Sequence, residues 1–207
     1  MLMIDLNVFA GNSFFYPIKD SAYLCFKTLE KTDREMFIAG FQKLSPKSIY
    51  HRFFGFMKEL TEEQLENLLN IDQKDHVAWA AFDIEGDSTA GVGVGRYRRN
   101  AAYPEEAELA LTIIDEYQGK GVGTILLGIL YYLAGMAGIK VFTGVILSDN
   151  AKLIRRFKEL GADLKRVGWE YEIRLPVRTN FDQLPKTPYA GVIRPVLHFL
   201  TENNFCL

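Results

Sequence analysis

The sequence predicts an α/β (α+β) fold in which helices flank one mixed sheet. The first observation is a strand, a sharp turn and a long helix in direct succession over residues 107–138. Apolar and polar residues alternate over 107–113, three glycines follow, and a helical pattern begins at Thr124. The second observation is the order of elements along the chain: strand, helices, three strands, helix, strand, helix, two strands. This order indicates an α/β layout with a mixed sheet.

Composition limits the class of protein. The 207 residues suit one domain with appended ends, and 48% apolar and 24% charged residues are typical of a soluble globule. A net charge of −2 gives no basic field for nucleic acid. The two cysteines, Cys25 and Cys206, are too few for a disulfide framework or a metal site, which fits a cytoplasmic location. Asp5 stands where an export signal would carry a basic residue, so no such signal is expected.

The first half of the chain contains an opening strand and three helices. The strand is expected over 22–29, whereas residues 1–20 show no clear period. Three helices follow, each with a capping residue before it, over 33–44, 46–54 and 61–70. Two further strands then lead into the central strand, over 76–83 and 89–97, with a turn at 85–87.

The second half begins with an unusually apolar helix. Residues 122–139 carry no charge and reach the length of a membrane span, but the glycines within the run favour a buried helix. The remaining elements are a strand over 141–147, a helix capped at Asp149 and Asn150 and ended by Gly161, and two strands, 162–167 and 169–175, joined as a hairpin at Gly168. Prolines then mark a linker, and one short amphipathic helix is expected near 193–200.

A glycine-rich loop stands between the central strand and the long helix. It reads Gln118-Gly119-Lys120-Gly121-Val122-Gly123. Backbone N–H groups at a helix start lack partners inside the helix, and the helix dipole adds positive charge, so the loop suits an anion. Its spacing matches neither the P-loop nor the GxGxxG dinucleotide motif. The alternative is a plain strand–helix turn with a glycine cap.

This Q-x-x-G-x-G loop behind an apolar strand resembles the acyl-CoA pyrophosphate loop of the GNAT superfamily of N-acetyltransferases. The resemblance covers about residues 22–175, with 1–21 and 176–207 as extensions. It implies a mostly antiparallel central sheet flanked by helices, with acyl-CoA in the splay between the central strands. Four segments narrow it to the Pat-type bacterial protein lysine acetyltransferases: 45–69, 91–100, 107–127 and 148–162. Relatives of that type often carry a second domain, for which this chain has no room.

The resemblance implies acetyl-CoA as cosubstrate and assigns residues to it. The pyrophosphate would rest on the N–H groups of Gln118, Gly119, Lys120, Gly121, Val122 and Gly123 and on the Thr124 hydroxyl. The pantetheine arm would lie beside Thr112, Ile113 and Ile114, with free N–H groups on the two isoleucines. Asn150 would contact the pantetheine or would only cap its helix, and both readings stay open.

A general base must remove a proton from the amine, because a lysine at neutral pH is mostly ammonium. Glu108 stands on the central strand where Pat-type sequences carry their catalytic glutamate. The alternatives are a solvated charge at the strand edge, or Glu106 in its place. Many superfamily members have a tyrosine seven residues after the helix asparagine as general acid, but here that position is Phe157. No acid is therefore assigned.

The other polar residues receive simpler interpretations. Isolated histidines at 51, 76 and 198 show no metal-ligand spacing, and no metal is expected. Arg96, Arg98 and Arg99 would meet phosphates or an acidic substrate, or would form a solvated strand end, which is the favoured interpretation. Tyr131 and Tyr132 are expected in the core or an interface.

These observations together predict an acetyl-CoA-dependent N-acetyltransferase whose favoured acceptor is a protein lysine. A small amine or a protein N-terminus is the alternative acceptor. A further alternative is a domain that binds acyl-CoA without turnover. We expect no nucleic-acid partner and no membrane association, and the choice between monomer and homodimer stays open.

Overall fold

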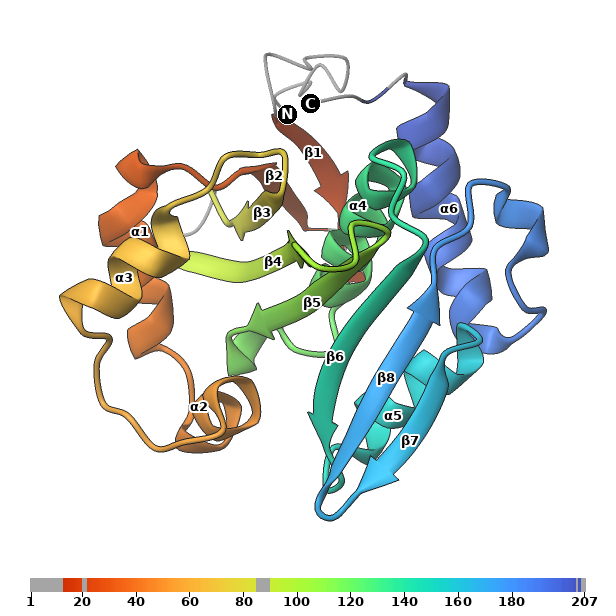
Figure 1. The fold of residues 1–207 in the computed structure, drawn as a ribbon. Helices are drawn as coiled ribbons and strands as arrows, with labels where there is room; N and C mark the ends of the chain where they lie inside the picture. Colours follow the sequence, from red (N-terminus) through yellow and green to blue (C-terminus); the bar gives the residue numbers. More distant parts are fainter. Residues whose placement is uncertain (1–12, 20–21, 85–89, 204, 206–207) are drawn as a thin grey trace.

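The fold is built on one eight-stranded sheet (Figure 1). The computed structural model describes residues 13–19, 22–84, 90–203 and 205. Neighbouring strands follow the order β1-β2-β3-β4-β5-β6-β8-β7, and only the β5–β6 pair is parallel among the described strands. The strands are β1 Ser13–Pro17, β2 Tyr23–Thr28, β3 His76–Phe82, β4 Gly91–Arg99, β5 Glu106–Ile113, β6 Val141–Leu147, β7 Asp163–Val167 and β8 Glu170–Pro176. The predicted mixed, mostly antiparallel sheet is confirmed.

Helices cover both faces of the sheet, and β3 shows how the faces divide. The helices are α1 Arg34–Gln42, α2 Pro46–Phe53, α3 Glu62–Leu69, α4 Val122–Met136, α5 Ala151–Glu159 and α6 Pro188–Glu202. Every residue of β3 is buried. Val77 and Trp79 pack in one core with side chains of α4 and α6. Ala78 and Ala80 point the other way, into a smaller core with α1 and α3.

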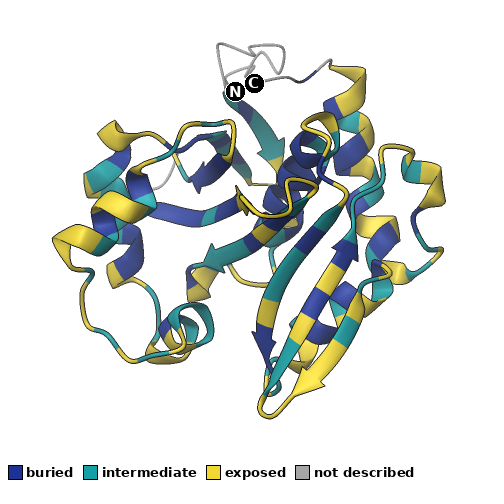
Figure 2. Ribbon diagram, in the orientation of Figure 1, coloured by how far each residue is buried: buried dark blue, intermediate teal, exposed yellow. Residues whose placement is uncertain are grey.

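Helix α4 is the buried centre of the molecule, as its uncharged sequence predicts (Figure 2). Glycines on β4 allow it to approach the sheet closely. A Cβ atom on Gly95 would lie 2.8 Å from Leu111 Cδ2 and 3.0 Å from Leu130 Cδ1. Within the described residues, no helix is both long and apolar enough to cross a bilayer.

The caps predicted for α2, α3 and α5 are confirmed, whereas Asp33 makes no side-chain hydrogen bond to α1, because its carboxylate accepts from the Glu30 N–H instead. Ser45 Oγ accepts a hydrogen bond from the N–H of Ser48 at the start of α2. Thr61 and Gln64 exchange the two hydrogen bonds of a capping box at the start of α3. Gly161 follows α5 with φ +85°. The hairpin of β7 and β8 turns at Gly168, as expected, whereas the turn predicted at 85–87 lies outside the described residues.

The two ends of the chain contribute more than the sequence pattern indicates. Strand β1 lies in a segment that shows no period, and it pairs with β2. Phe14 is its buried residue, and its ring packs against Phe26, Trp79 and Phe199 of α6. Burial of such a side chain is worth roughly 1.5–3 kcal/mol. Helix α6 is longer than the short helix predicted, because Thr187 caps it early and a proline occupies its first turn.

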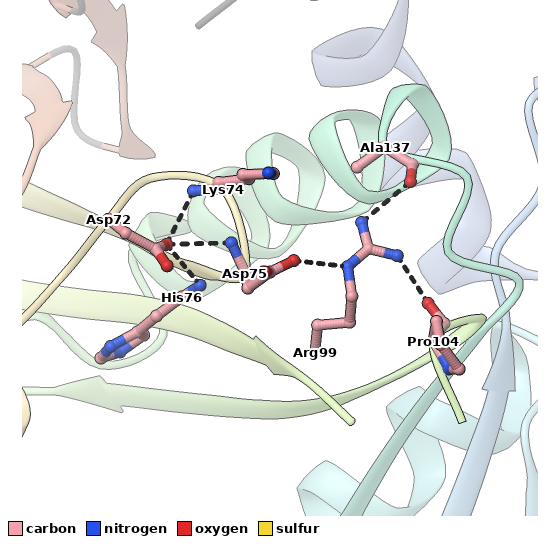
Figure 3. Close-up of polar contacts among 7 residues, drawn as sticks. All are labelled: Asp72, Lys74, Asp75, His76, Arg99, Pro104 and Ala137. Carbon is pink, nitrogen blue, oxygen red and sulfur yellow. Dashed lines mark hydrogen bonds and ion pairs between the residues drawn. The ribbon is translucent and has the colours of Figure 1, made fainter. Parts of the chain in front are cut away.

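Arg99 connects the end of β4 to the end of α4 and to the loop before β5 through hydrogen bonds (Figure 3). Its guanidinium donates to Asp75 Oδ1 at 2.9 Å, to the Pro104 carbonyl at 2.5 Å and to the Ala137 carbonyl at 2.9 Å. The interpretation of Arg99 as part of a solvated strand end is therefore wrong. The segments around residues 75, 104 and 137 meet at this one side chain.

Candidate active site

Strands β5 and β6 separate after a short parallel contact. Their register contains three pairs, Glu106–Val141, Ala107–Phe142 and Glu108–Thr143. Beyond them the two ribbons diverge (Figure 1). Strand β4 stays paired with β5 as far as Ile113. The edge of β5 that faces β6 is therefore open toward its C-terminal end, which is the splay that the resemblance implies.

One backbone donor at the end of β5 differs from the prediction. Ile114 donates its N–H to the carbonyl of Val92 at 3.0 Å, so this group is not free for a ligand. The expectation for Ile114 is wrong because its N–H extends the β4–β5 contact. Hydrogen-bonding direction alternates along a strand, which aims the N–H of Ile113 toward the open edge.

The glycine loop has the backbone shape of an anion-binding turn. Gly119 and Gly121 have backbone φ angles of +81° and +103°, which residues other than glycine rarely adopt. Two N–H groups of the loop form hydrogen bonds within the turn. Gln118 donates to the Asp115 carbonyl at 3.2 Å, and Lys120 donates to the Tyr117 carbonyl at 3.5 Å. Of the described backbone, no acceptor faces the remaining loop N–H groups, which are those of Gly119, Gly121, Val122 and Gly123. The loop therefore offers fewer donors than predicted, all next to the N-terminus of α4.

A groove of about 480 Å³ runs past this loop, between α2 and the first turn of α5. The predicted residues that line it are Thr112, Ile113, Gln118, Gly119, Gly121, Gly123, Thr124 and Asn150. Ile114 and Val122 are buried elsewhere, and the Lys120 ammonium lies 4.9 Å from the centroid of the Tyr117 ring. The groove is also lined by Lys47, Arg52, Lys152 and Arg156, so basic side chains gather near the glycine loop.

Helix α2 forms one wall of the groove, and hydrogen bonds attach it to residues on either side of the groove. The Asp115 carboxylate accepts hydrogen bonds from the Ser45 N–H at 2.9 Å, the Ser45 hydroxyl at 2.8 Å and the Ser48 hydroxyl at 3.1 Å. Burial raises the pKa of Asp115, but these hydrogen bonds outweigh burial and hold it below its ordinary value. Across the groove, His51 Nε2 lies 3.0 Å from Asp149 and lowers the pKa of that carboxyl. Helix α2 therefore links the end of β5 to the start of α5.

Tyr189 is a groove residue that the sequence did not reveal. It lies on α6, and its hydroxyl is 3.3 Å from Oγ1 of Thr124, the predicted pyrophosphate contact. The Arg156 guanidinium lies 5.1 Å from the centroid of its ring. Burial raises the pKa of Tyr189, so its phenol stays protonated at neutral pH. No local pattern connects these residues, because the packing of α6 against α4 brings them together.

Glu108 lies in a second cavity of about 200 Å³ beside the groove. Arg52 lines both spaces, so the cavity and the groove share a wall. Burial lowers the pKa of Arg52, and the nearby charge of Glu108 opposes that change. Glu106, the alternative base, instead forms an ion pair with Arg174 of β8 at 2.5 Å. The two glutamates thus have different surroundings: Glu108 lines the cavity, and Glu106 is paired with an arginine.

Arg96 forms the inner wall of the same cavity. The residue is only 8% exposed, and its Nη1 donates to the Leu68 carbonyl at 2.7 Å. Burial, with the nearby Arg52 and Arg98, lowers the pKa of Arg96 to about 9. The interpretation of Arg96 as a solvated strand end is wrong, because α1 packs against β4 and Leu68 of α3 accepts the hydrogen bond of Arg96. Arg98 is exposed, as that interpretation expects.

The remaining predicted positions fall in the groove or in the core. Asn150 Oδ1 accepts a hydrogen bond from the Leu153 N–H at 3.3 Å, so it caps α5 while also lining the groove. Phe157 is buried there and carries no transferable proton. Tyr131 is buried in the core, as expected. The described residues contain no cluster of three or more His, Cys, Asp or Glu side chains that would hold a metal ion.

Known proteins with similar sequences and folds are acetyltransferases. The model of the acetyltransferase (GNAT) domain family matches residues 24–163. The chain is 32% identical over 130 residues to acetyltransferase Pat of Mycolicibacterium smegmatis, covering 63% of this chain and 38% of that protein. It is 31% identical over 160 residues to an acetyltransferase of Pseudomonas aeruginosa, covering 76% of this chain and 82% of that protein. The solved GNAT domain of S. lividans PAT superposes with a TM-score of 0.71 at 25% identity, covering 79% of this chain and 96% of that one.

The chain thus spans less than two fifths of the Pat protein, and the family match over residues 24–163 contains the glycine loop and Glu108. The order of the strands, the separation of β5 from β6, the glycine loop and the family match all indicate the same family. The chain belongs to the GNAT family of acetyltransferases and is an N-acyltransferase that takes its acetyl group from acetyl-CoA.

Proposed function

We propose that the chain acetylates lysine side chains of proteins, with Glu108 as the general base. The observation that carries this proposal is the position of Glu108, in a cavity that shares Arg52 with the groove. The resemblance to Pat-type enzymes puts the catalytic glutamate at the same point of the same strand. Glu106 is the weaker candidate, because Arg174 already occupies its carboxylate.

The groove supplies the contacts that acetyl-CoA needs. Its pyrophosphate fits the loop N–H groups that face no acceptor in the described backbone, where the α4 dipole adds positive charge. The pantetheine arm fits the open edge of β5, along Thr112 and Ile113. Tyr189 and Thr124 place hydroxyl groups on the groove wall.

The reaction then needs one proton acceptor and one oxyanion donor. Glu108 takes a proton from the lysine ammonium, directly or through water, and the free amine attacks the thioester carbonyl carbon. An N–H at the splay, assigned to Ile113, stabilises the negative oxygen of the tetrahedral intermediate. As the C–S bond breaks and the amide forms, the nitrogen loses its second proton, which water passes to the CoA thiolate, because Phe157 has no proton to give.

The surface beyond α2 supports a protein rather than a small molecule as acceptor. Phe56 is 83% exposed, and its ring stacks on Tyr50 of α2 with the centroids 5.1 Å apart. Phe54 follows α2 directly and is also exposed. Large aromatic side chains in the open are typical of protein-binding surfaces. The three aromatic residues lie on α2 or just after it, and α2 also carries Arg52, which lines both the groove and the Glu108 cavity.

An acceptor screen tests the proposal. Purified chain and acetyl-CoA are incubated with a deacetylated protein extract, a set of small primary amines, and peptides with free N-termini, and products are identified by mass spectrometry. New acetyl-lysine in intact proteins is the expected result. Acetylation confined to small amines or to N-termini would refute the lysine assignment. Acetyl-CoA binding with no product in any arm would indicate a domain that binds acyl-CoA without turnover.

A further inference from the structure

The cavity around Glu108 holds more positive charge than a general base requires. Three guanidinium groups, those of Arg52, Arg96 and Arg98, share it with one carboxylate, which leaves a formal charge of +2 (three minus one). The β4–β5 register pairs Arg98 with Glu108 and Arg96 with Ala110. Side chains of such pairs lie on the same face of a sheet. The small Ala110 leaves open space in front of the Arg96 guanidinium.

These arginines lack acidic partners. Throughout the described ranges, no carboxylate lies within 4.0 Å of the charged nitrogens of Arg52, Arg96 or Arg98. Arg96 makes its short contacts with the Leu68 carbonyl at 2.7 Å and with His76 Nε2 at 3.4 Å. Most of the donor groups of this buried guanidinium are left unused by these contacts.

His76 adds no compensating negative charge. Its Nδ1 lies 2.9 Å from the Asn70 carbonyl, which places the proton on Nδ1 and leaves Nε2 to accept. Burial, together with the adjacent arginines, lowers the pKa of His76, so it is neutral at pH 7. The Asp72 carboxylate beside it is occupied by the backbone N–H groups of the turn before β3, as Figure 3 shows.

Arg99, one residue further along β4, shows the contrast. All three of its nitrogens donate to protein groups, as described above (Figure 3). Arg99 therefore has a structural role that satisfies it. Arg96 lines the cavity with donors to spare, and the exposed Arg98 lines it with one long contact, from Nη2 to His76 Nδ1 at 3.4 Å. A buried guanidinium without a carboxylate partner is costly unless a ligand supplies one.

We propose that this cavity binds a carboxylate carried by the acceptor close to its reactive amine; the inference rests on the proposed function. A carboxylate matches the planar fork of an arginine side chain. A space of about 200 Å³ has room for one such group. Glu108 in the same cavity attracts the ammonium, while the arginines attract the carboxylate, so together they orient the acceptor. Arg96 and Arg98 are thus residues that determine specificity.

The carboxylate has two possible sources, and the experiment separates them. Binding is measured by calorimetry with the protein saturated with CoA, so that no turnover is needed. One pair of ligands is a terminally blocked lysine peptide with glutamate beside the lysine, and the same peptide with glutamine. The other pair is free lysine and lysine amide. Each pair is measured with wild type, with Arg98→Gln, and with Arg166→Gln, a control that removes an exposed arginine of β7.

In the wild type, the carboxylate member of at least one pair binds about tenfold more tightly than its neutral partner. Arg98→Gln reduces that ratio to below about threefold, while Arg166→Gln preserves it. A peptide effect assigns the carboxylate to a neighbouring acidic residue, and a free-lysine effect assigns it to the α-carboxylate. Equal binding within both pairs, no binding of any ligand, or an unchanged ratio in Arg98→Gln would each overturn the inference.

This readout separates the inference from the proposed function. If discrimination by charge is observed but no acceptor is acetylated, the carboxylate site stands and the lysine acetyltransferase proposal fails. If acetylation proceeds equally well with acidic and neutral acceptors, the proposed function stands and the carboxylate site is refuted. Thermal unfolding of each variant confirms that it is folded.

Discussion

Replacement of Gly121 by alanine isolates the contribution of the loop backbone. Gly121 is the residue before α4 and has φ +103°, where a Cβ atom strains the backbone. The built Cβ meets no atom within 4 Å, so the change introduces strain without a clash. Gly138, just beyond the other end of α4, provides the control: its φ is +76° and its Cβ would also meet nothing within 4 Å.

The expected magnitudes follow from this geometry. A left-handed conformation costs a residue other than glycine about 1–2 kcal/mol. Each variant should therefore unfold about 2–8 °C lower for a chain of this size. Only Gly121→Ala shifts the N–H groups that face the groove. Loss of one hydrogen bond to a phosphate oxygen is worth about 1.5–3 kcal/mol, which is about 10- to 150-fold in affinity.

Calorimetric titration with acetyl-CoA measures the affinities, and differential scanning calorimetry measures the melting temperatures. We expect Gly121→Ala to lose at least tenfold in affinity, about 1.4 kcal/mol, and Gly138→Ala to bind within about twofold of wild type. The reasoning is refuted if both glycine variants bind equally well, or if they lose affinity to the same extent, because binding would then not depend on the loop backbone.

Two further predictions concern the groove walls. The lowered pKa of Asp115 means that its bonds to Ser45 and Ser48 stabilise the fold fully above the ordinary value of 3.8 and are lost as the pH falls through the lower folded value. Asp115→Asn should therefore flatten the acid limb of a stability–pH curve measured by denaturant unfolding, and an unchanged limb would contradict this. Tyr189→Phe should raise the KM for acetyl-CoA several-fold with little change in kcat, since its hydroxyl adjoins Thr124 on the groove wall; an effect on kcat alone in steady-state kinetics would disprove a binding role.

Local patterns explain why much of the fold was predictable. Caps such as Ser45 and Thr61, and the glycine after α5, act within a few residues, so their signals are visible in sequence. Strand β1 was missed because its half-buried aromatic residues do not alternate in polarity. Helix α6 was underestimated because prolines obscure its beginning.

The site was predictable only where it follows one continuous segment. The loop and the end of β5 are contiguous, and the sequence located them together. The burial of Arg96 and the position of Tyr189 depend on α3 and α6, whose packing no local pattern encodes. Ile114 shows a finer limit, because which N–H group is free depends on the exact residue at which the β4–β5 pairing ends.

The most direct test of the account compares Glu108→Gln with Glu106→Gln in steady-state acetyl transfer to a lysine peptide. The two glutamates lie on one strand, but only Glu108 lines the cavity beside the groove, while Glu106 is paired with Arg174. We predict that Glu108→Gln lowers kcat by about 10²–10⁴-fold with unchanged acetyl-CoA affinity, and that Glu106→Gln stays close to wild type. Equal kcat for Glu108→Gln and wild type, or a large loss in Glu106→Gln alone, would contradict the account.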